Sequence, residues 1–451
     1  MRKTIFCKAF LLILAFITLM EITILAQPTQ IWATRYSGPT AGNDEAIAIA
    51  IDSSKNVYVT GSSYNMSWNL DYATVMYNSS GVQQWVSRYN GPGDGEDRAN
   101  AITADSSGNC YVTGKCINSS GNADYATIKY LNDGAQAWAT RYDGPANLDD
   151  EAYAIAVDDS GNVYVTGKSL GGVGDLDYVT VKYNSLGTQE WAIRYSYSLD
   201  DVAYAIDVDN SGNIYVTGGE WRINTIKYNS AGTQQWFAYY DTPPGSHYDR
   251  GRAIFVDGSG NVYVTGSGIG DGTQWDYITV KYNSSGVQQW ASRYDFGFLD
   301  DSAIAITVDG SENVYVTGSS YSSTSNDDYA TIKYNSSGVQ EWVARYNGTG
   351  NSQDISKDIE LDGLGNVYVT GWSYRTGFYN DYSTIKYNNS GVKQWEVHYH
   401  GGSDSDYGQG LCVDSSNDIY VTGFSMGSGT SNDYATIKYS ENPDVDCWIN
   451  Y

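Results

Sequence analysis

The chain has 451 residues, of which 52 are acidic and 26 basic, so its net charge is −26 at neutral pH. An acidic surface of this strength repels phosphate backbones, which argues against nucleic acid as a partner and leaves divalent cations, cationic partners or simple solubility. Five cysteines in a chain of this length also exclude a disulfide-stabilised scaffold.

Residues 1–26 have the layout of a secretory leader. Basic residues precede an apolar stretch over residues 9–20, and small residues near Ala26 offer a cleavage site. An uncleaved membrane anchor is the alternative, but Glu21 interrupts an apolar run that is already shorter than the ~20 residues a span needs. We therefore expect cleavage and a secreted mature chain without a transmembrane segment, located outside the cell, on its surface or in the periplasm.

Residues 27–440 repeat one unit of about fifty residues eight times. The third copy contains four phrases, Asp150–Asp158, Asn162–Gly167, Asp177–Tyr183 and Gly187–Trp191. The glycine that closes the second phrase recurs at Gly61, Gly114, Gly167, Gly218, Gly266, Gly318, Gly371 and Gly423. The tryptophan that closes the fourth recurs at Trp32, Trp85, Trp138, Trp191, Trp236, Trp290, Trp342 and Trp395. A repeat this regular predicts one cyclic domain rather than several domains.

Each unit contains four short runs without helical period, which predicts a four-stranded antiparallel sheet. The first run, as in Ala46–Ile51, alternates small with branched residues, as expected of an innermost strand near a crowded axis. The other three runs carry apolar residues on both parities, so neighbouring sheets must cover both faces of each sheet. The sequence therefore predicts an all-β fold, a single eight-bladed β-propeller of four-stranded blades.

The repeat begins in mid-unit, with a fourth strand at Trp32–Tyr36 that has no first three strands of its own. It ends after the third strand of the eighth unit, Asp433–Tyr439. We expect these two strands to pair, because ring closure removes exposed sheet edges. Residues 441–451 form a C-terminal tail in which Trp448 could compete for the same edge.

The cysteines offer one pairing worth considering. Cys110 and Cys116 share a predicted strand and lie ~20 Å apart, far beyond the reach of a disulfide. Cys412 with Cys447 is the remaining possibility.

Three phrases carry a family resemblance: Asn162–Gly167, Asp124–Tyr130 and Gly81–Trp85. They resemble the SBBP beta-propeller repeat, which is found in secreted and surface proteins of bacteria, and the resemblance spans all eight units. The Gly-x-x-x-Trp ending also resembles the tryptophan-docking element of quinoprotein-like eight-bladed propellers. The resemblance implies the fold but little about function, because propellers host many activities. No residues break the repeat in the way a quinone cofactor would require, so we expect no cofactor.

An aspartate opens the first strand of every unit. The set is Asp44, Asp97, Asp150, Asp201, Asp249, Asp301, Asp354 and Asp406. These side chains should lie near the mouth of the central channel, where like charges raise one another's pKa unless cations or hydrogen-bond donors compensate. Calcium at the mouth is one solution, and capping of backbone amides in the adjacent loops is the other, which we favour.

A second aspartate opens the third strand and has a candidate partner in the fourth. Counting across the hairpin, with Tyr77 facing Val82, brings each of these aspartates opposite an arginine. The pairs are Asp71 with Arg88, Asp124 with Arg141, Asp177 with Arg194, Asp276 with Arg293 and Asp328 with Arg345. In the fourth unit both members change together, to Arg222 and Tyr239. We expect structural ion pairs, which a one-residue bulge would make diagonal.

The loop between the second and third strands, called the variable loop here, differs from copy to copy while the hairpins at the opposite end barely change. Candidate ligand-binding aromatic residues in these loops are Tyr64, Trp68, Trp275, Tyr321, Trp372, Tyr374, Phe378 and Tyr379. Variable loops on a repetitive scaffold are common binding surfaces, although these side chains could equally cover blade edges.

Catalytic patterns are scarce. The sequence has three histidines, and the His398-x-His400 pair has no recognisable third zinc ligand. The leading hypothesis is a secreted, monomeric, non-enzymatic propeller that binds glycan or protein through its loop-rich face. The alternatives are a polysaccharide lyase or hydrolase that uses carboxylates at the rim, and a periplasmic protein-assembly scaffold.

Overall fold

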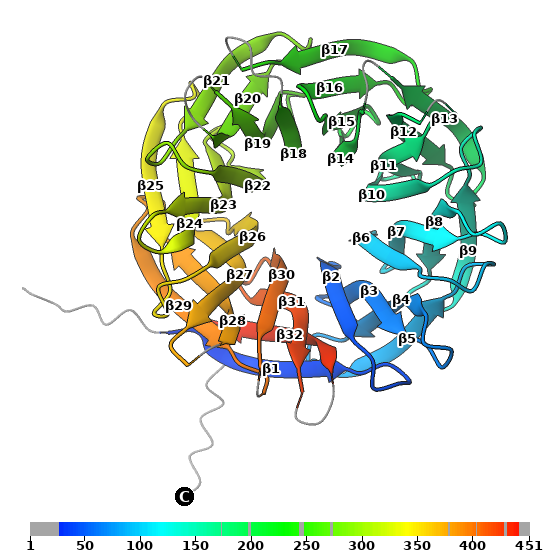
Figure 1. The fold of residues 1–451 in the computed structure, drawn as a ribbon, viewed down its shortest axis with the longest axis horizontal. Coiled ribbons are helices and arrows are strands. Elements are labelled where there is room, and N and C mark those ends of the chain that lie inside the picture. The colour runs from blue at the N-terminus through cyan, green and yellow to red at the C-terminus, as the bar shows by residue number, and fades with distance from the viewer. Residues whose placement is uncertain are drawn as a thin grey trace, which may run out of the picture.

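The structure is a computed structural model that describes residues 27–172, 174–196, 200–242, 248–270, 274–377, 379–402, 404–427 and 431–441. Within these residues the chain forms eight four-stranded antiparallel sheets and no helix. The sheets surround one axis as the blades of a propeller (Figure 1). The predicted fold class, an all-β eight-bladed propeller, is confirmed. No helix that could span a membrane occurs among these residues.

Each of blades 1 to 7 is built from four consecutive strands. The strands of blades 1 to 4 are β2 (Asp44–Ile51), β3 (Val57–Tyr64), β4 (Leu70–Tyr77) and β5 (Gln83–Tyr89); β6 (Arg98–Ala104), β7 (Cys110–Ile117), β8 (Ala123–Tyr130) and β9 (Gln136–Tyr142); β10 (Asp150–Val157), β11 (Val163–Leu170), β12 (Leu176–Tyr183) and β13 (Gln189–Tyr195); β14 (Ala203–Val208), β15 (Ile214–Gly218), β16 (Ile223–Tyr228) and β17 (Gln234–Tyr240). The strands of blades 5 to 7 are β18 (Asp249–Val256), β19 (Val262–Ile269), β20 (Trp275–Tyr282) and β21 (Gln288–Tyr294); β22 (Asp301–Val308), β23 (Val314–Ser322), β24 (Asn326–Tyr334) and β25 (Gln340–Tyr346); β26 (Asp354–Leu361), β27 (Val367–Arg375), β28 (Tyr379–Tyr387) and β29 (Lys393–Tyr399). Blade 8 contains β30 (Asp406–Val413), β31 (Ile419–Met426) and β32 (Asn432–Ser440), and is completed by β1 (Thr29–Tyr36).

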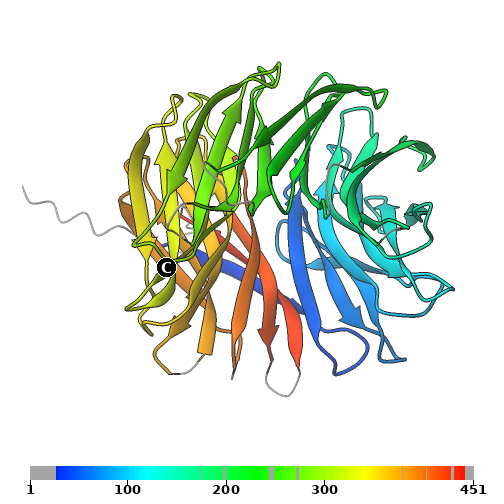
Figure 2. The ribbon, with the colours of Figure 1, turned by 45° about the horizontal axis from the view of Figure 1, so that its top comes forward.

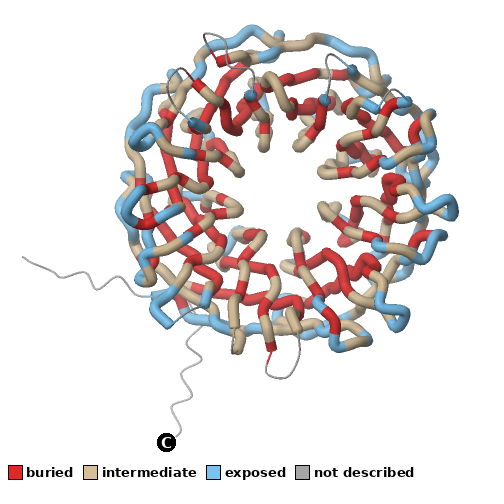
Figure 3. Tube along the Cα trace, in the orientation of Figure 1, coloured by how far each residue is buried: buried red, intermediate tan, exposed pale blue. Residues whose placement is uncertain are grey.

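Apolar layers between adjacent blades form the core. Tyr111 and Tyr125 of blade 2, for example, pack with Val163 and Val165 of blade 3, and all four are buried. The middle strands are therefore buried, whereas the outermost strands are mostly exposed or half-buried (Figure 3). Figure 2 shows the strands running from one face of the ring toward the other. Variable loops gather at one face and hairpin turns at the opposite one.

A tryptophan on the outer strand of each blade ties that blade to the next. Trp85 Nε1 donates a hydrogen bond to the carbonyl of Asn132, 3.0 Å away, in the outer hairpin turn of blade 2. Gly134 in that turn has φ +84° and lies against the indole, and a Cβ there would come within 2.6 Å of the ring. Glycine is therefore required twice, by its backbone conformation and by the close approach. Equivalent indole hydrogen bonds are made by Trp32, Trp138, Trp191, Trp236, Trp290 and Trp342.

The ring closes through β1, as predicted. Strand β1 pairs antiparallel with β32, from Tyr36 opposite Tyr434 to Thr29 opposite Ser440, with one irregularity after Gln30. In Figure 1, the dark blue β1 lies outside the red β32. The last blade takes its outer strand from β1, and the indole of Trp395 in blade 7 donates to Glu441 at 2.7 Å.

Several sequence predictions lie outside the described residues. These are the leader over residues 1–26, Phe378, and the tail from residue 442 onward, including Trp448 and Cys447. Cys110, Cys116 and Cys412 carry free thiols in the described part of the chain.

Candidate functional site

Every innermost strand carries a β-bulge at the same place, and three adjacent blades have a tyrosine or an arginine there. In blade 3, Ala152 pairs with Gly167 and Ala154 with Thr166, so Tyr153 between them has no ladder partner. Bulges redirect a side chain out of the regular alternation. The bulge residues are Tyr153, Tyr204 and Arg252 in blades 3 to 5, and Ile47, Asn100, Ile304, Lys357 and Gln409 elsewhere.

Blade 4 lacks a long variable loop. Its second strand, β15, ends at Gly218 and β16 begins at Ile223, so these strands have five and six residues where most others have eight. Gly219 has φ +112°, and a Cβ there would come within 1.8 Å of the carbonyl oxygen of Arg222. This glycine turn forms a short loop between β15 and β16, so the variable-loop end of blade 4 projects less than those of its neighbours.

A pocket of about 290 Å³ lies over this shortened loop, at the face of the variable loops. It spans three blades and is lined by Tyr153, Lys168, Leu176, Asp200, Val202, Tyr204, Glu220, Trp221, Tyr248 and Arg250. We call it the fourth-blade pocket. Two stacked aromatic pairs line it: Tyr153 with Tyr204, with ring centroids 5.7 Å apart, and Trp221 with Tyr248, 4.8 Å apart.

The two cations that line the fourth-blade pocket are each paired with a glutamate. Lys168 Nζ lies 3.2 Å from Glu151, and Arg250 Nε lies 2.6 Å from Glu220. The Tyr204 hydroxyl donates to Glu220 at 2.5 Å. Burial, together with this hydrogen bond to Glu220, raises the pKa of Tyr204 to about 12, so the phenol stays protonated and remains a donor. The pocket thus combines apolar ring faces with oriented donors and acceptors.

A larger pocket on the opposite face is a weaker candidate. It has a volume of about 390 Å³, lies between the hairpin turns of blades 3 and 4, and includes Asp158 and Asp209. Asp158 is committed to its own turn, because its carboxylate accepts the amides of Ser160 and Asn162 at 2.9 Å each. No aromatic ring occurs among the lining residues that the structure describes.

The structure does not gather the predicted aromatic residues into one site. Trp68 and Tyr379 are exposed, by 62% and 39%, but lie in blades 1 and 7. Trp372 packs on Tyr407, with ring centroids 5.4 Å apart, and Tyr374 lies against Gly350. Half-buried positions hold Tyr64, Trp275 and Tyr321.

One predicted aromatic residue adjoins the fourth-blade pocket. The guanidinium of Arg250 lies 5.0 Å from the ring of Trp275. The other predicted aromatic residues that the structure describes lie in blades 1, 6 and 7, away from the fourth-blade pocket.

The aspartates that open the first strands are buried and cap backbone amides of the preceding linker. Asp44 accepts the N–H of Gly38 at 2.5 Å, and Asp354 accepts those of Gly348 and Tyr374 at 2.7 and 3.0 Å. Equivalent linker contacts are made by Asp97, Asp150, Asp249, Asp301 and Asp406. Asp201 accepts the side-chain amide of Asn224 at 3.3 Å. Calcium binding by this set stays a prediction.

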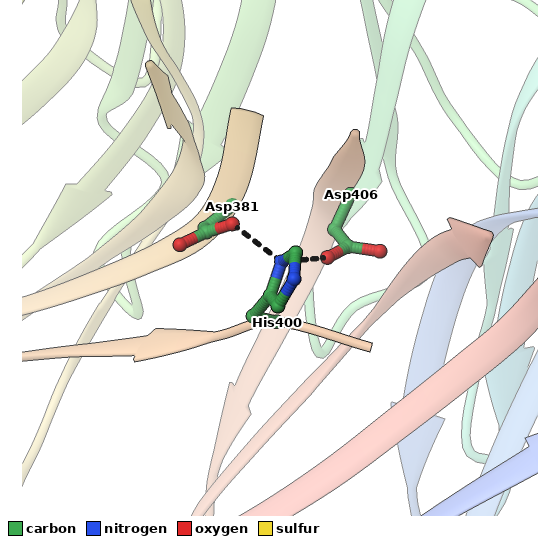
Figure 4. Close-up of side chains that lie close together, drawn as sticks. All are labelled: Asp381, His400 and Asp406. Atoms are coloured by element: carbon green, nitrogen blue, oxygen red, sulfur yellow. Dashed lines mark hydrogen bonds and ion pairs between the residues drawn. The ribbon is translucent and has the colours of Figure 1, made fainter. Parts of the chain in front are cut away.

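Three of these aspartates belong to clusters at joints between blades. In one cluster, His400 Nδ1 lies 3.0 Å from Asp381 and 3.3 Å from Asp406 (Figure 4). The other two clusters contain Asp124, Asp143 and Asp150, and Asp276, Asp295 and Asp301. His398 instead contacts the Ser383 hydroxyl at 2.8 Å. The two imidazoles therefore have different partners rather than a shared one.

Four of the five predicted ion pairs are in contact, but through a different register. Arg88 lies opposite Ala73 rather than Asp71. Tyr77 pairs with Gln83 rather than with Val82, and the ladder shifts by one further residue between Met76 and Tyr77. The predicted register was therefore wrong, and the long arginine reaches its aspartate diagonally. Arg88 lies 3.2 Å from Asp71. Contacts also join Arg345 with Asp328 at 2.8 Å, Arg194 with Asp177, and Arg293 with Asp276.

The fifth pair is not formed: Arg141 makes no ion pair with Asp124 in the described part of the chain. In blade 6 the arginine is also held by the hydroxyl and carbonyl of Ser320. Cys116 occupies the corresponding place in blade 2, opposite Asp124, and a thiol is a weak hydrogen-bond acceptor. The guanidinium of Arg141 therefore lacks the serine hydroxyl that helps to hold Arg345 in blade 6.

This difference predicts different results from two double-mutant cycles. Asp328→Asn with Arg345→Met should show a coupling energy on the order of 1 kcal/mol, because removing either member leaves the other charge partly buried. Asp124→Asn with Arg141→Met should show a much smaller coupling, because these two charges interact only at longer range. The free energy of unfolding of each variant by urea denaturation provides the measurement. Equal coupling in both cycles would contradict the contacts described here.

Three segments of the chain match the model of a known repeat. The model of the SBBP beta-propeller repeat matches residues 137–174, 235–272 and 341–379. The chain carries SBBP repeats. No curated protein sequence matches it significantly.

Several solved structures are similar to this chain at low identity. The Neurospora crassa Pan2 WD40 domain is 9% identical, with 92% of this chain and 96% of that chain covered and a TM-score of 0.47. A polysaccharide lyase, the PL25 ulvan lyase, is 13% identical over 84% and 97%, with a TM-score of 0.46. A Dyadobacter fermentans protein of unknown function is 8% identical over 92% and 99%, with a TM-score of 0.44. At these values none of the three likenesses carries an argument about function.

Most of the fourth-blade pocket was not predicted from the sequence. The signal was present in the first strands of blades 3 to 5. Tyr153, Tyr204 and Arg252 stand there at the position of Ile47, and Arg250 stands at that of Glu45. Comparison of departures within the first strand, rather than within the variable loops, would have found these residues.

Proposed function

We propose that this propeller is a non-enzymatic binding protein that holds a glycan in the fourth-blade pocket. The observation that carries the proposal is the presence of two stacked aromatic pairs beside fixed ion pairs in one pocket. Sugar rings present apolar C–H faces and hydroxyl edges, which match aromatic faces and oriented polar groups.

The contacts of the glutamates in and beside the pocket support a binding role rather than a catalytic one. Glu220 is engaged by both Arg250 and Tyr204, and Glu151, which adjoins the pocket, is engaged by Lys168 and Tyr153. Carboxylates held in this way suit fixed hydrogen-bond recognition of hydroxyl groups. The proposal includes secretion, for which the leader-like residues 1–26 are the support.

Trp221→Ala is expected to weaken glycan binding by more than tenfold, or ~1.4 kcal/mol, because it removes one ring face from the pocket. A glycan array identifies ligands for residues 27–451, and isothermal titration calorimetry then measures the affinity of the strongest one. Trp68→Ala is the matched control, since Trp68 is an exposed variable-loop residue in blade 1, and it should bind normally.

Two results would contradict the proposal. If Trp68→Ala weakened binding and Trp221→Ala did not, the site would lie on the variable loops as the sequence first indicated. Release of product from any polysaccharide in a parallel turnover screen would make the protein an enzyme. A protein array run alongside tests a protein ligand in place of a glycan.

A further inference from the structure

The bulge residue of blade 5 places a cation beside the fourth-blade pocket. The guanidinium of Arg252 lies over the ring of Tyr204, 4.3 Å from its centroid. Tyr204 lines the pocket and stacks on Tyr153. A guanidinium held on an aromatic face keeps its planar fork in a defined orientation.

Arg252 differs from the other cations of this region in having no acidic partner. Lys168 and Arg250 are each paired with a glutamate, at 3.2 and 2.6 Å. Arg252 makes no ion pair with any residue among those the structure describes. The remaining acid of the pocket, Asp200, is exposed and accepts the amide of Leu176 at 3.0 Å. Among the described residues, the positive charge of Arg252 therefore has no paired carboxylate.

This charge stands out against the rest of the chain, whose net charge of −26 repels anions. Two of the other bulge residues, Ile47 and Ile304, are apolar, so the fold does not require a cation at this position. A guanidinium binds carboxylate and sulfate groups through two parallel hydrogen bonds.

We propose that the ligand of the fourth-blade pocket is an acidic glycan whose carboxylate or sulfate binds the guanidinium of Arg252 while a neighbouring sugar ring packs on the pocket's aromatic faces. This inference rests on the proposed function and names the class of ligand. The acidic group supplies the counter-charge that the described residues do not give Arg252.

The experiment compares three probes of equal length by isothermal titration calorimetry: an oligogalacturonate, the neutral oligosaccharide obtained by reducing its carboxyl groups, and a sulfated oligosaccharide. Wild type should bind an acidic probe at least tenfold more tightly than the neutral one, and the sulfated and carboxylated arms identify which anion is preferred. Arg252→Gln should remove this difference and flatten the dependence of affinity on NaCl. Lys357→Gln, which removes a cation at the equivalent bulge of blade 7, is the matched control and should retain the difference.

The outcomes separate this inference from the proposed function. If acidic and neutral probes bound equally, or if Arg252→Gln bound acidic probes as wild type does while Trp221→Ala weakened all probes, the pocket would bind glycans but the acidic class would be wrong. If no glycan bound, the proposed function would fail as well. Melting temperatures verify that each variant is folded, and Arg252→Lys, which keeps the charge but not the fork, should show intermediate affinity.

Discussion

Deletion of residues 27–36 is expected to lower the melting temperature by roughly 10 °C or more and to produce soluble oligomers or aggregates. The deletion removes β1 and exposes the edge of β32 along its length. It also removes Trp32, whose ring lies between Tyr77 and Tyr420, with centroids 6.5 and 6.1 Å away. The contact between blades 8 and 1 thus loses both its outer strand and its docking tryptophan.

Two further variants define the cause. Trp32→Ala should destabilise the protein by roughly 2 kcal/mol, because it keeps the strand and removes only the ring. Truncation of residues 442–451 should leave the melting temperature unchanged. Differential scanning calorimetry and size-exclusion chromatography provide the readouts. A normal melting curve after deletion of β1, with a lowered one after truncation of the tail, would mean that the tail closes the ring in solution.

The sequence predicted the fold well because each level of organisation repeats eight times. One tryptophan per unit, such as Trp85, and one glycine in the adjoining turn, such as Gly134, together define the contact between blades. The unpaired strand at Trp32–Tyr36 then required a partner, and β32 supplied it. Averaging over eight copies suppresses the local ambiguity that limits inference from a single strand.

The strand register and the functional site were harder to predict, because neither follows from the repeated residue pattern. The hairpin pairs Tyr77 with Gln83 rather than with Val82, and a bulge follows between Met76 and Tyr77. The residue pattern signals neither feature, so counting from the hairpin gave the wrong partners. The functional candidates depart from the repeat, in Tyr204, Arg252 and the short turn at Gly219. The sequence contains these departures, but the fold shows that three blades bring them to one place.

The same buried carboxylates that cap the linkers predict an unusual dependence of stability on pH. Burial raises the pKa of five linker-capping aspartates to about 6, and these are Asp97, Asp150, Asp249, Asp301 and Asp354. Burial and the neighbouring Asp358 raise the pKa of Glu360 to about 8. Each of these groups binds its proton more tightly in the folded state than in the unfolded state, where the pKa is about 4.

The sign follows from linkage. Between pH ~4 and the folded-state pKa, the folded protein holds more protons than the unfolded chain, so stability falls as the pH rises. The turn aspartates act in the opposite sense, because hydrogen bonds to their carboxylates outweigh the effect of burial and lower their pKa below 3.8. Their contribution is present above the unfolded-state pKa and is lost only in stronger acid. The stability maximum should therefore lie near pH 4–5 rather than near neutrality.

We expect the melting temperature to rise by several degrees when the pH is lowered from 8 to 5 at constant ionic strength. Glu360→Gln should raise the melting temperature at pH 8 and change it little at pH 5. The glutamine is uncharged at both pH values, whereas Glu360 in the folded protein is uncharged only at pH 5. Glu96→Gln, an exposed substitution of the same kind, controls for the change in net charge. Differential scanning fluorimetry across this range, repeated at high salt to screen surface repulsion, makes the measurement. A melting temperature that is flat or falls on acidification from pH 8 to 5 would mean that the caps are fully ionised in the folded protein and that their hydrogen bonds offset the cost of burial.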